Sequence, residues 1–367
     1  MLSFTPHFVK SLISRIFPDM RKTQQVNLSL GIYGQIKSQS GLMSEIVREV
    51  PGATKHKHRL KRFWRFLSNP RIKPERLQGH WVYWCLKTFC HDKYIKVAMD
   101  WTTLPGNIQC LMIAFVFHGR TIPLIWQCVL YSNIKGSQNM IEERLIARLV
   151  NIVKNGYPKK KLLLTADRGF GRSTLMQFLI KKNILFVLRV RADVAIIQSK
   201  NRLLLRNLGK TLRYETPVWY DRITYRNDGK VTNINLAAIV AKPKNGKEPD
   251  PWFLVTNLRK ANTAIERYSE RFHIEEWFKD MKHQLGISTI QTKSLKRVRR
   301  ILFLSCVSYG ITCLIGNVIN RYKTVKDSLI TGGKKTASRV WFALKIIKYK
   351  LVNRIFWRKV YLLATSP

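Results

Sequence analysis

Residues 94–102, Tyr-Ile-Lys-Val-Ala-Met-Asp-Trp-Thr, mark the point where the sequence pattern changes from helix to strand. Short apolar runs bounded by turn residues are typical of buried strands, and this run fits that pattern. Two further strands are predicted at 111–117 and 121–130, on either side of a turn at His118-Gly119. The region therefore opens with three strands that follow one another closely enough to pair in antiparallel fashion.

The next segments alternate between helix and strand. A helical pattern over 139–153 leads to a buried strand at 161–167, and a second helix over 173–181 leads to a strand at 184–190. Three antiparallel strands followed by helix, strand, helix and strand indicate an α/β fold. This is the element order of a ribonuclease H-like core.

The chain is strongly basic along its whole length. It contains 66 Lys and Arg residues against 21 Asp and Glu residues, which gives a formal net charge of +45. A positive field of this size attracts polyanions, and nucleic acid is the first candidate. An anionic membrane is the alternative, but the longest apolar stretch, 301–319, contains serine, threonine and glycine. We expect this stretch to be a buried helix and predict no membrane partner.

A basic helix is predicted near the end of the N-terminal region. Residues 55–67 read KHKHRLKRFWRFL, so aromatic side chains can anchor the helix while the cations face outward. Lys57, Arg59, Lys61 and Arg62 are candidate contacts to DNA phosphates. The alternative is a solvated charged face.

The chain divides into four parts by pattern. Apolar residues at helical spacing fill the N-terminal region, and strand patterns with a turn signal at Asn227-Asp228-Gly229 fill a long insertion before the last helices. We predict a helical DNA-binding domain at 1–90, a ribonuclease H-like core at 91–191 and 257–320, a β-rich insertion at 192–256 and a basic helical region at 321–367.

The cysteines indicate a reducing compartment. They lie at positions 85, 90, 110, 128, 306 and 313 and include no Cys-x2-Cys pair. We expect reduced structural thiols, with a zinc site at Cys85, Cys90 and His91 as the weaker alternative. Because no signal peptide is evident, we expect a cytoplasmic protein associated with the nucleoid.

Two aspartates lie at the ends of predicted strands. Asp100 falls near the end of the first strand, and Asp167 ends the fourth strand before Arg168-Gly169-Phe170. Each could be only a turn former or a helix cap. However, functional groups gather at strand ends in α/β sheets. If the helix containing Glu275 packs on this sheet, three carboxylates converge, and such oxygen ligands suit Mg²⁺ or Mn²⁺.

The segment 268–282, YSERFHIEEWFKDMK, places four polar side chains on one helix face. Tyr268, Arg271, Glu275 and Lys282 are spaced by three, four and seven residues. On a helix they fall within a stripe of roughly 60°. Glu275 could bind a metal ion while the other three hold phosphate oxygens. A solvated stripe of ion pairs is the alternative, although the many apolar neighbours favour burial.

The chain resembles DDE transposases of the insertion sequence 4 family. Asp100, Asp167 and Glu275 match the acidic triad of that family, and residues 268–282 match its Tyr-x2-Arg-x3-Glu-x6-Lys signature. The resemblance covers most of the chain. It implies metal-dependent cleavage of DNA at transposon ends and strand transfer, by a cut-and-paste route through a hairpin intermediate. Two Mg²⁺ or Mn²⁺ ions would be held by the three acids.

The resemblance also implies partners and further contacts. Transposases of this kind act on terminal inverted repeats and target DNA as a homodimer in a paired-end complex, with dimer contacts from the C-terminal region. Tyr268, Arg271 and Lys282 would contact phosphates, and Arg168 is a further candidate. In relatives that use a hairpin, a tryptophan from the insertion stacks on a flipped base. Trp252 occupies the corresponding position, and core packing is its alternative role.

Two other functions remain open. A metal-dependent nuclease built on the same core would cleave DNA without joining it. A non-catalytic DNA-binding relative would keep the charge but would have lost a residue of the triad or the signature. No such residue is missing from this sequence, which counts against the second alternative.

Overall fold

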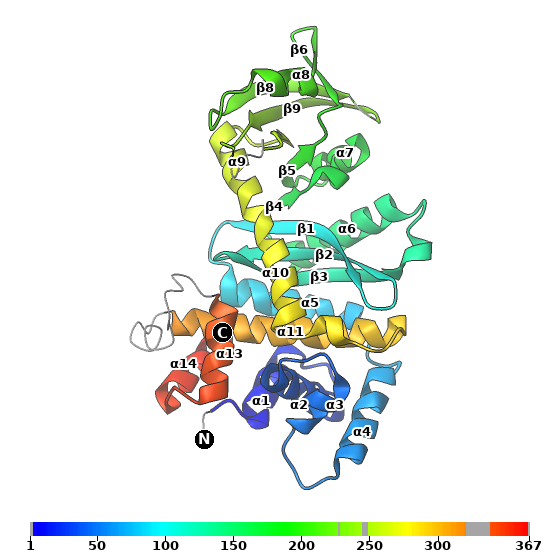
Figure 1. Ribbon diagram of the computed structural model, residues 1–367, viewed down its shortest axis with the longest axis vertical. Helices are drawn as coiled ribbons and strands as arrows, with labels where there is room; N and C mark the ends of the chain where they lie inside the picture. Colours follow the sequence, from blue (N-terminus) through cyan, green and yellow to red (C-terminus); the bar gives the residue numbers. More distant parts are fainter. Residues whose placement is uncertain (1–2, 227, 244–248, 321–337, 366–367) are drawn as a thin grey trace.

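The strand that begins at Tyr94 lies inside a ten-stranded sheet in the computed structural model of the chain (Figure 1). The structure describes residues 3–226, 228–243, 249–320 and 338–365. Asn227 of the predicted turn and residues 321–337 of the predicted C-terminal region lie outside the described residues.

The sheet contains the predicted strands in one layer, with antiparallel and parallel pairs. Its spatial order is β3-β2-β1-β4-β5-β10-β9-β8-β6-β7, in which β1 pairs antiparallel with β2 and parallel with β4. The strands are β1 Tyr94–Leu104, β2 Ile108–Phe117, β3 Arg120–Leu130, β4 Lys161–Ala166, β5 Leu185–Val190, β6 Ala195–Gln198, β7 Asn201–Leu204, β8 Val218–Arg226, β9 Lys230–Ile239 and β10 Trp252–Thr256. The predicted element order of the first five strands is therefore confirmed, while the boundaries of the four parts stay a prediction.

The insertion continues this sheet. Strand β10 pairs antiparallel with β5 on one side and with β9 on the other. The hairpin of β8 and β9 then carries the sheet outward to β6 and β7. The β-rich character of the insertion was predicted, but its merger with the core sheet was not.

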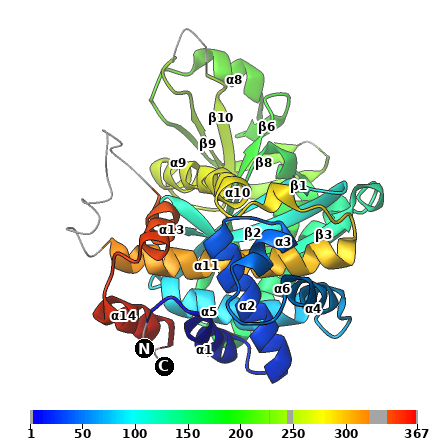
Figure 2. The ribbon, with the colours of Figure 1, turned by 60° about the horizontal axis from the view of Figure 1, so that its bottom comes forward.

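Helices cover the sheet and form a separate layer at one end. Figure 2 shows this end, where α1 to α5 gather around α11. The helices are α1 Pro6–Ile16, α2 Lys22–Ser38, α3 Met43–Arg48, α4 His56–Ser68, α5 Pro74–Phe89, α6 Gln138–Gly156, α7 Ser173–Lys181, α8 Leu205–Thr211, α9 Ala261–Ser269, α10 His273–His283, α11 Leu295–Ile319, α13 Arg339–Tyr349 and α14 Arg354–Thr365. Short 3-10 turns include η2 Arg168–Phe170 and η3 Glu270–Phe272.

Helix α11 is the buried apolar helix that the sequence predicts. By length and composition it could cross a membrane, but 94% of its most apolar window is buried inside the protein. It contacts α2, α5 and β3, so it joins the helical layer to the sheet. Gly310 permits close packing there, because a Cβ atom at this position would lie 2.3 Å from the Trp81 ring.

The cysteines are free and buried, in agreement with the prediction of structural thiols. Burial raises the pKa of the Cys85 thiol well above its ordinary value, so the thiol stays protonated. Within the described part of the chain, no group of three or more His, Cys, Asp or Glu side chains is arranged to hold a metal ion. The zinc alternative at Cys85, Cys90 and His91 therefore receives no support.

Helices α9 and α10 form a nearly continuous rod across one face of the sheet (Figure 1). Helix α9 contacts β4, β5, β9 and β10, and α10 contacts β1, β2 and β3. The helix that contains Glu275 therefore packs on the sheet, which was the condition for the three predicted acids to converge.

A buried polar cluster fixes the far end of this rod. The Arg120 guanidinium at the start of β3 donates to the Asp280 carboxylate over 2.9 Å and lies 3.6 Å from Glu276. The Tyr309 hydroxyl of α11 donates to the same Asp280 carboxylate over 3.2 Å. Burial raises the pKa of Asp280, and the Arg120 cation opposes this rise. One carboxylate thus joins α10, β3 and α11.

Replacing Arg120 by leucine is expected to destabilise the protein, because Asp280 would be left buried without its cation. Removal of one partner of a buried ion pair costs about 3–5 kcal/mol. Chemical denaturation monitored by circular dichroism measures this free energy of unfolding. Lys279→Met is the control on the exposed side of α10 and should leave it nearly unchanged. Equal losses for both variants would show that the cluster does not fix the helix.

Candidate active site

The register of β1 and β4 brings two aspartates side by side. These parallel strands pair Met99 with Ala166. The residue after each of them is an aspartate, Asp100 after Met99 and Asp167 after Ala166. Because side chains alternate between faces, two residues at matching positions point to the same face. The two predicted acids are therefore neighbours, but only Asp167 lies at a strand end, because β1 continues past Asp100 to Leu104.

The face on which Asp100 lies is the face covered by the α9–α10 rod. Lys96, four residues earlier on β1, shares this face and its ammonium group lies 3.2 Å from the Glu270 carboxylate of η3. Arg271, the next residue of η3, places its guanidinium 3.5 Å from Asp100. These two contacts fix the rod above β1.

Arg271 also binds Glu275, one helical turn further along the rod. Its guanidinium donates to the Glu275 carboxylate over 2.8 Å. The Arg271 side chain is only 6% exposed, whereas that of Glu275 is 46% exposed. Glu275 thus lies on the solvent-exposed side of the site. Arg271 is buried and lies between the carboxylates of Asp100 and Glu275.

The three acids influence one another electrostatically. Burial raises the pKa of Asp100 from 3.8 to about 6, with further increases from the charges of Asp167 and Glu275. The cation of Arg271 and the backbone N–H of Trp101 oppose this increase. Asp100, Asp167 and Glu275 therefore form one carboxylate cluster, in which Arg271 pairs with Asp100 and Glu275.

Asp167 also has a local role at the end of β4. Its carboxylate accepts a hydrogen bond of 2.9 Å from the Gly169 backbone N–H and caps the short helix η2. The capping role that served as the alternative for Asp167 is thus present. One carboxylate oxygen of Asp167 can accept the capping hydrogen bond while the other oxygen faces the neighbouring acids, so the two roles are compatible.

Tyr268 and Trp252 pack together beside Arg271. Tyr268 is fully buried, and the Arg271 guanidinium carbon lies 5.6 Å from its ring centroid. The Trp252 ring lies 4.9 Å from the Tyr268 ring and 5.7 Å from that of Phe272, between centroids. Burial raises the pKa of the Tyr268 phenol, so it remains a hydrogen-bond donor. Trp252 takes part in core packing here, and base stacking stays a prediction.

The other predicted contacts are not gathered around the acids. Lys282 is exposed in the last turn of α10, and Lys57, Lys61 and Arg62 are exposed on α4. Arg59 donates a hydrogen bond to the Val50 carbonyl group, so it also holds the loop before α4. For these residues, contact with phosphate stays a prediction.

A fourth carboxylate, which the sequence analysis missed, connects the two aspartate segments. Glu142 of α6 is fully buried and accepts a hydrogen bond of 2.9 Å from the Trp101 indole N–H. It also forms an ion pair with Arg172, which donates to the Gly169 carbonyl group over 3.1 Å. Trp101 follows Asp100, and Gly169 lies two residues after Asp167. Glu142 and Arg172 therefore position both aspartates.

The acids fit a hard divalent cation by their chemistry. Three carboxylates with close mutual influence provide the oxygen ligands that Mg²⁺ and Mn²⁺ prefer. In the described residues they are not arranged as a finished metal site, because Arg271 bridges Asp100 and Glu275.

Comparison with known proteins assigns most of the chain to a defined family. Residues 92–311, more than half of the chain, match the family model described as the transposase DDE domain. This segment contains Asp100, Asp167 and Glu275. A search of curated proteins gave no match.

The raised pKa of Asp100 predicts a specific pH dependence of stability without divalent ions. Between about pH 4 and pH 6 the folded protein binds more protons at Asp100 than the unfolded chain does, so its stability falls as pH rises through this window. A rise of two pKa units corresponds to about 3 kcal/mol. Asp100→Asn should remove this loss, as measured by thermal unfolding at several pH values in EDTA.

The exposed Asp221 offers a matched control for this prediction. Asp221→Asn should keep the wild-type pH profile. If the profiles of Asp100→Asn and wild type coincide, Asp100 does not titrate in this window.

Glu142→Gln is expected to lower the melting temperature, because the amide cannot neutralise the partly buried Arg172. The expected loss of stability is about 3 kcal/mol, at the lower end for a broken buried ion pair. Differential scanning calorimetry of this variant and of the neighbouring Glu143→Gln provides the comparison. A loss as large for Glu143→Gln would show that charge removal on α6, and not the bridge, is responsible.

Proposed function

This chain belongs to the transposase DDE domain family, and we propose that it is a transposase of the insertion sequence 4 family. In this proposal it cleaves DNA at the ends of a transposable element and transfers the ends to target DNA. The route is cut-and-paste and passes through a hairpin intermediate.

The observation that supports this proposal best is the cluster of Asp100, Asp167 and Glu275 around Arg271. Two of these acids follow paired positions of the parallel strands β1 and β4, and the third comes from the helix packed above them. The strand order β3-β2-β1-β4-β5 supports a ribonuclease H-like core. The full Tyr-x2-Arg-x3-Glu-x6-Lys signature at 268–282 supports the assignment to the insertion sequence 4 family.

DDE transposases generally use divalent metal ions. In this chain Asp100, Asp167 and Glu275 would hold two Mg²⁺ or Mn²⁺ ions. Bound ions would supply an activated oxygen nucleophile and stabilisation of the leaving oxygen. Arg271 offsets the mutual repulsion of the acids before the ions bind, which lets the carboxylates remain close together.

The remaining signature residues would orient the DNA backbone. Lys282 is exposed on α10 and free to approach a phosphate as a point charge. Arg271 can turn part of its guanidinium toward a phosphate oxygen once Glu275 leaves it. Tyr268 would donate a hydrogen bond from its buried position. The indole face of Trp252, if it moves from its packed position, would stack on a flipped base.

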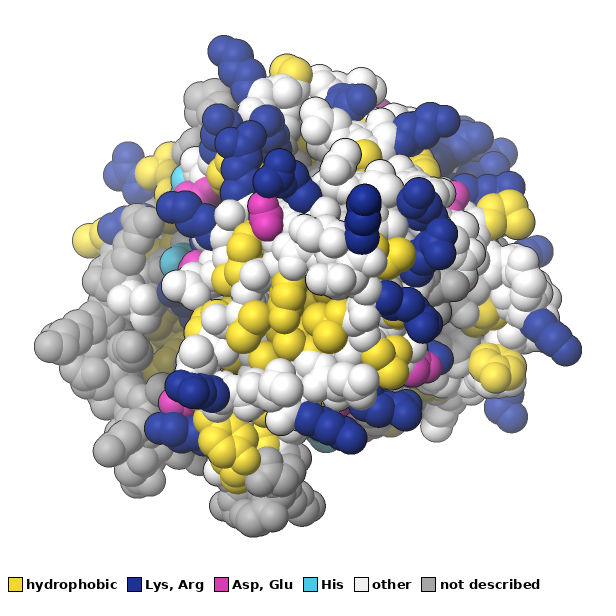
Figure 3. Space-filling model, turned by 90° about the horizontal axis from the view of Figure 1, so that it is seen from above, with side chains coloured by type: hydrophobic (Ala, Val, Ile, Leu, Met, Phe, Trp, Pro, Cys, Tyr) yellow, Lys and Arg dark blue, Asp and Glu magenta, His cyan; other side chains and the backbone are white. Residues whose placement is uncertain are grey.

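The surface charge suits double-stranded DNA as the partner. Figure 3 views the molecule from the end where the insertion lies, and Lys and Arg side chains far outnumber Asp and Glu on this face. Exposed cations of α4 extend the basic surface to the N-terminal helices, which we propose as a DNA-binding domain. We further propose a homodimer that pairs two DNA ends, in the cytoplasm, where the buried cysteines stay reduced.

Glu275→Gln is expected to abolish DNA cleavage and leave DNA binding intact, because the amide is a poor metal ligand and keeps the side-chain shape. The assay incubates linear DNA with the ends that flank the gene, in Mg²⁺ or Mn²⁺, and separates the products on a denaturing gel. Wild type should nick at a defined end and give hairpin and joined products, with a loss of at least about a thousandfold in the variant.

Glu266→Gln, an exposed position on α9, is the matched control and should cleave like wild type. Cleavage without joined products would favour a nuclease over a transposase. Binding without cleavage by wild type would favour a DNA-binding protein that has lost its activity. Parallel loss of binding and cleavage in Glu275→Gln would assign Glu275 a structural role.

A further inference from the structure

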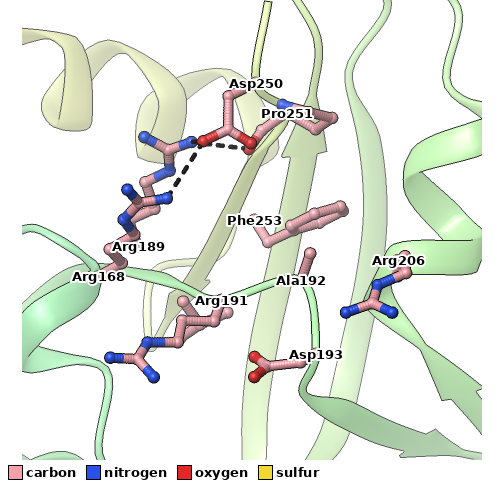
Figure 4. A pocket seen from close by; sticks show the side chains of 10 residues that line it. Arg168, Arg189, Arg191, Ala192, Asp193, Arg206, Asp250, Pro251 and Phe253 are labelled. Atoms are coloured by element: carbon pink, nitrogen blue, oxygen red, sulfur yellow. Dashed lines mark hydrogen bonds and ion pairs between the residues drawn. The ribbon is translucent and has the colours of Figure 1, made fainter.

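A pocket of about 400 Å³ lies beside the carboxylate cluster, where the core meets the insertion. Its lining includes Arg168, Arg189, Arg191 and Arg206 together with Asp193 and Asp250. Figure 4 shows that these side chains come from η2, the end of β5, the segment between β5 and β6, α8 and the segment before β10. Four guanidinium groups against two carboxylates leave the pocket with an excess of positive charge.

One carboxylate of the pocket engages two of the arginines at once. The same oxygen of Asp250 lies 2.7 Å from the Arg189 guanidinium and 3.4 Å from that of Arg168. Arg189 also donates to the Pro251 carbonyl group over 3.1 Å, and its side chain is only 16% exposed. Two converging guanidinium groups on one anionic oxygen make the arrangement that also recognises a phosphate oxygen.

The Asp250 carboxylate is poorly protected. Its side chain is 62% exposed, so the ion pairs are open to water and are weak. A phosphate has more oxygens to offer than a carboxylate and can accept from several guanidinium groups together. A phosphate that enters the pocket can therefore displace Asp250 from Arg168 and Arg189.

The position of the pocket relates it to the acids. Arg168 follows Asp167 directly in the chain, and Arg189 lies near enough to Tyr268 that its charge opposes the rise in the Tyr268 pKa that burial causes. Arg191, Asp193 and Arg206 are exposed on the side of the insertion. A DNA strand that passes from the carboxylate cluster toward the insertion would thus place a phosphate within reach of these arginines.

We propose that this pocket binds a backbone phosphate of the DNA substrate, and that Asp250 occupies the phosphate position in the free protein. The inference rests on the proposed function, since it takes DNA as the substrate. Asp250 then acts as an internal competitor that only a well-placed phosphate removes. The pocket holds the DNA in position and takes no part in breaking the phosphodiester bond.

The test compares two aspartates of the same pocket. Fluorescence anisotropy measures binding of a labelled duplex from the transposon end to wild type, Asp250→Asn and Asp193→Asn. Both changes add the same charge, but only Asp250→Asn releases Arg168 and Arg189. We expect roughly three- to tenfold tighter binding for Asp250→Asn and less than about twofold for Asp193→Asn. Equal effects of the two substitutions would overturn the inference.

A second comparison uses two cations of one helix. Arg206 lines the pocket, whereas Lys210 lies one turn further along α8 and is exposed outside it. Arg206→Gln should reduce the slope of log affinity against log salt concentration by about one, and Lys210→Gln should leave the slope unchanged. The same slope for both variants would contradict a phosphate contact in the pocket.

The outcomes separate this inference from the proposed function. If wild type binds and cleaves DNA but the matched variants do not differ, the pocket assignment fails and the transposase assignment stands. If inorganic phosphate or pyrophosphate binds in a manner that depends on Asp250 while duplex DNA does not, the pocket serves a small phosphate compound and the inference is wrong. If wild type does not bind DNA at all, both assignments fail.

Discussion

The ion pairs of Arg271 with Asp100 and Glu275 are the interaction on which the site depends. A guanidinium that is 6% exposed has lost most of its hydration, which the neighbouring acids offset, and the cation between the two acids reduces their repulsion. These ion pairs join the helical rod to β1. The parallel register of β1 and β4 supplies Asp100 and Asp167, and η3 supplies the arginine. The fold and the carboxylate cluster therefore stabilise each other.

Further buried charges hold the elements around this centre. Glu142 and Arg172 connect the segment that follows Asp100 with the segment that precedes α7. Arg120 and Asp280 connect α10 with the edge of the sheet. Each buried carboxylate receives several donors, as expected where desolvation makes an unpaired charge costly. The acids of these clusters are a minority of the 21 Asp and Glu residues in this basic chain. The excess cations stay at the surface, where a polyanion can reach them.

Much of the fold and part of the site could be predicted from the sequence. The strands and helices from Tyr94 to Val190 follow local apolar patterns, and Asp167 directly follows β4 as predicted, whereas Asp100 lies inside β1, which continues to Leu104. The spacing of Tyr268, Arg271 and Glu275 on one helix face correctly anticipated their proximity.

Local patterns do not reveal which residues pair over long separations. Glu142 shows no motif in α6, and its contacts with Trp101 and Arg172 join residues 41 and 30 positions away. The inward orientation of Arg271 and the continuation of the sheet into the insertion likewise depend on tertiary packing.

The central claim is that the carboxylates around Arg271 form the metal site of a DNA-cleaving enzyme. Anomalous X-ray scattering from crystals of the protein bound to a transposon-end duplex and Mn²⁺ tests it most directly. The account predicts an anomalous peak between Asp100 and Asp167, with Glu275 turned away from Arg271 toward the metal. Mn²⁺ found only elsewhere, with Arg271 still bridging Asp100 and Glu275 in the presence of DNA, would contradict it.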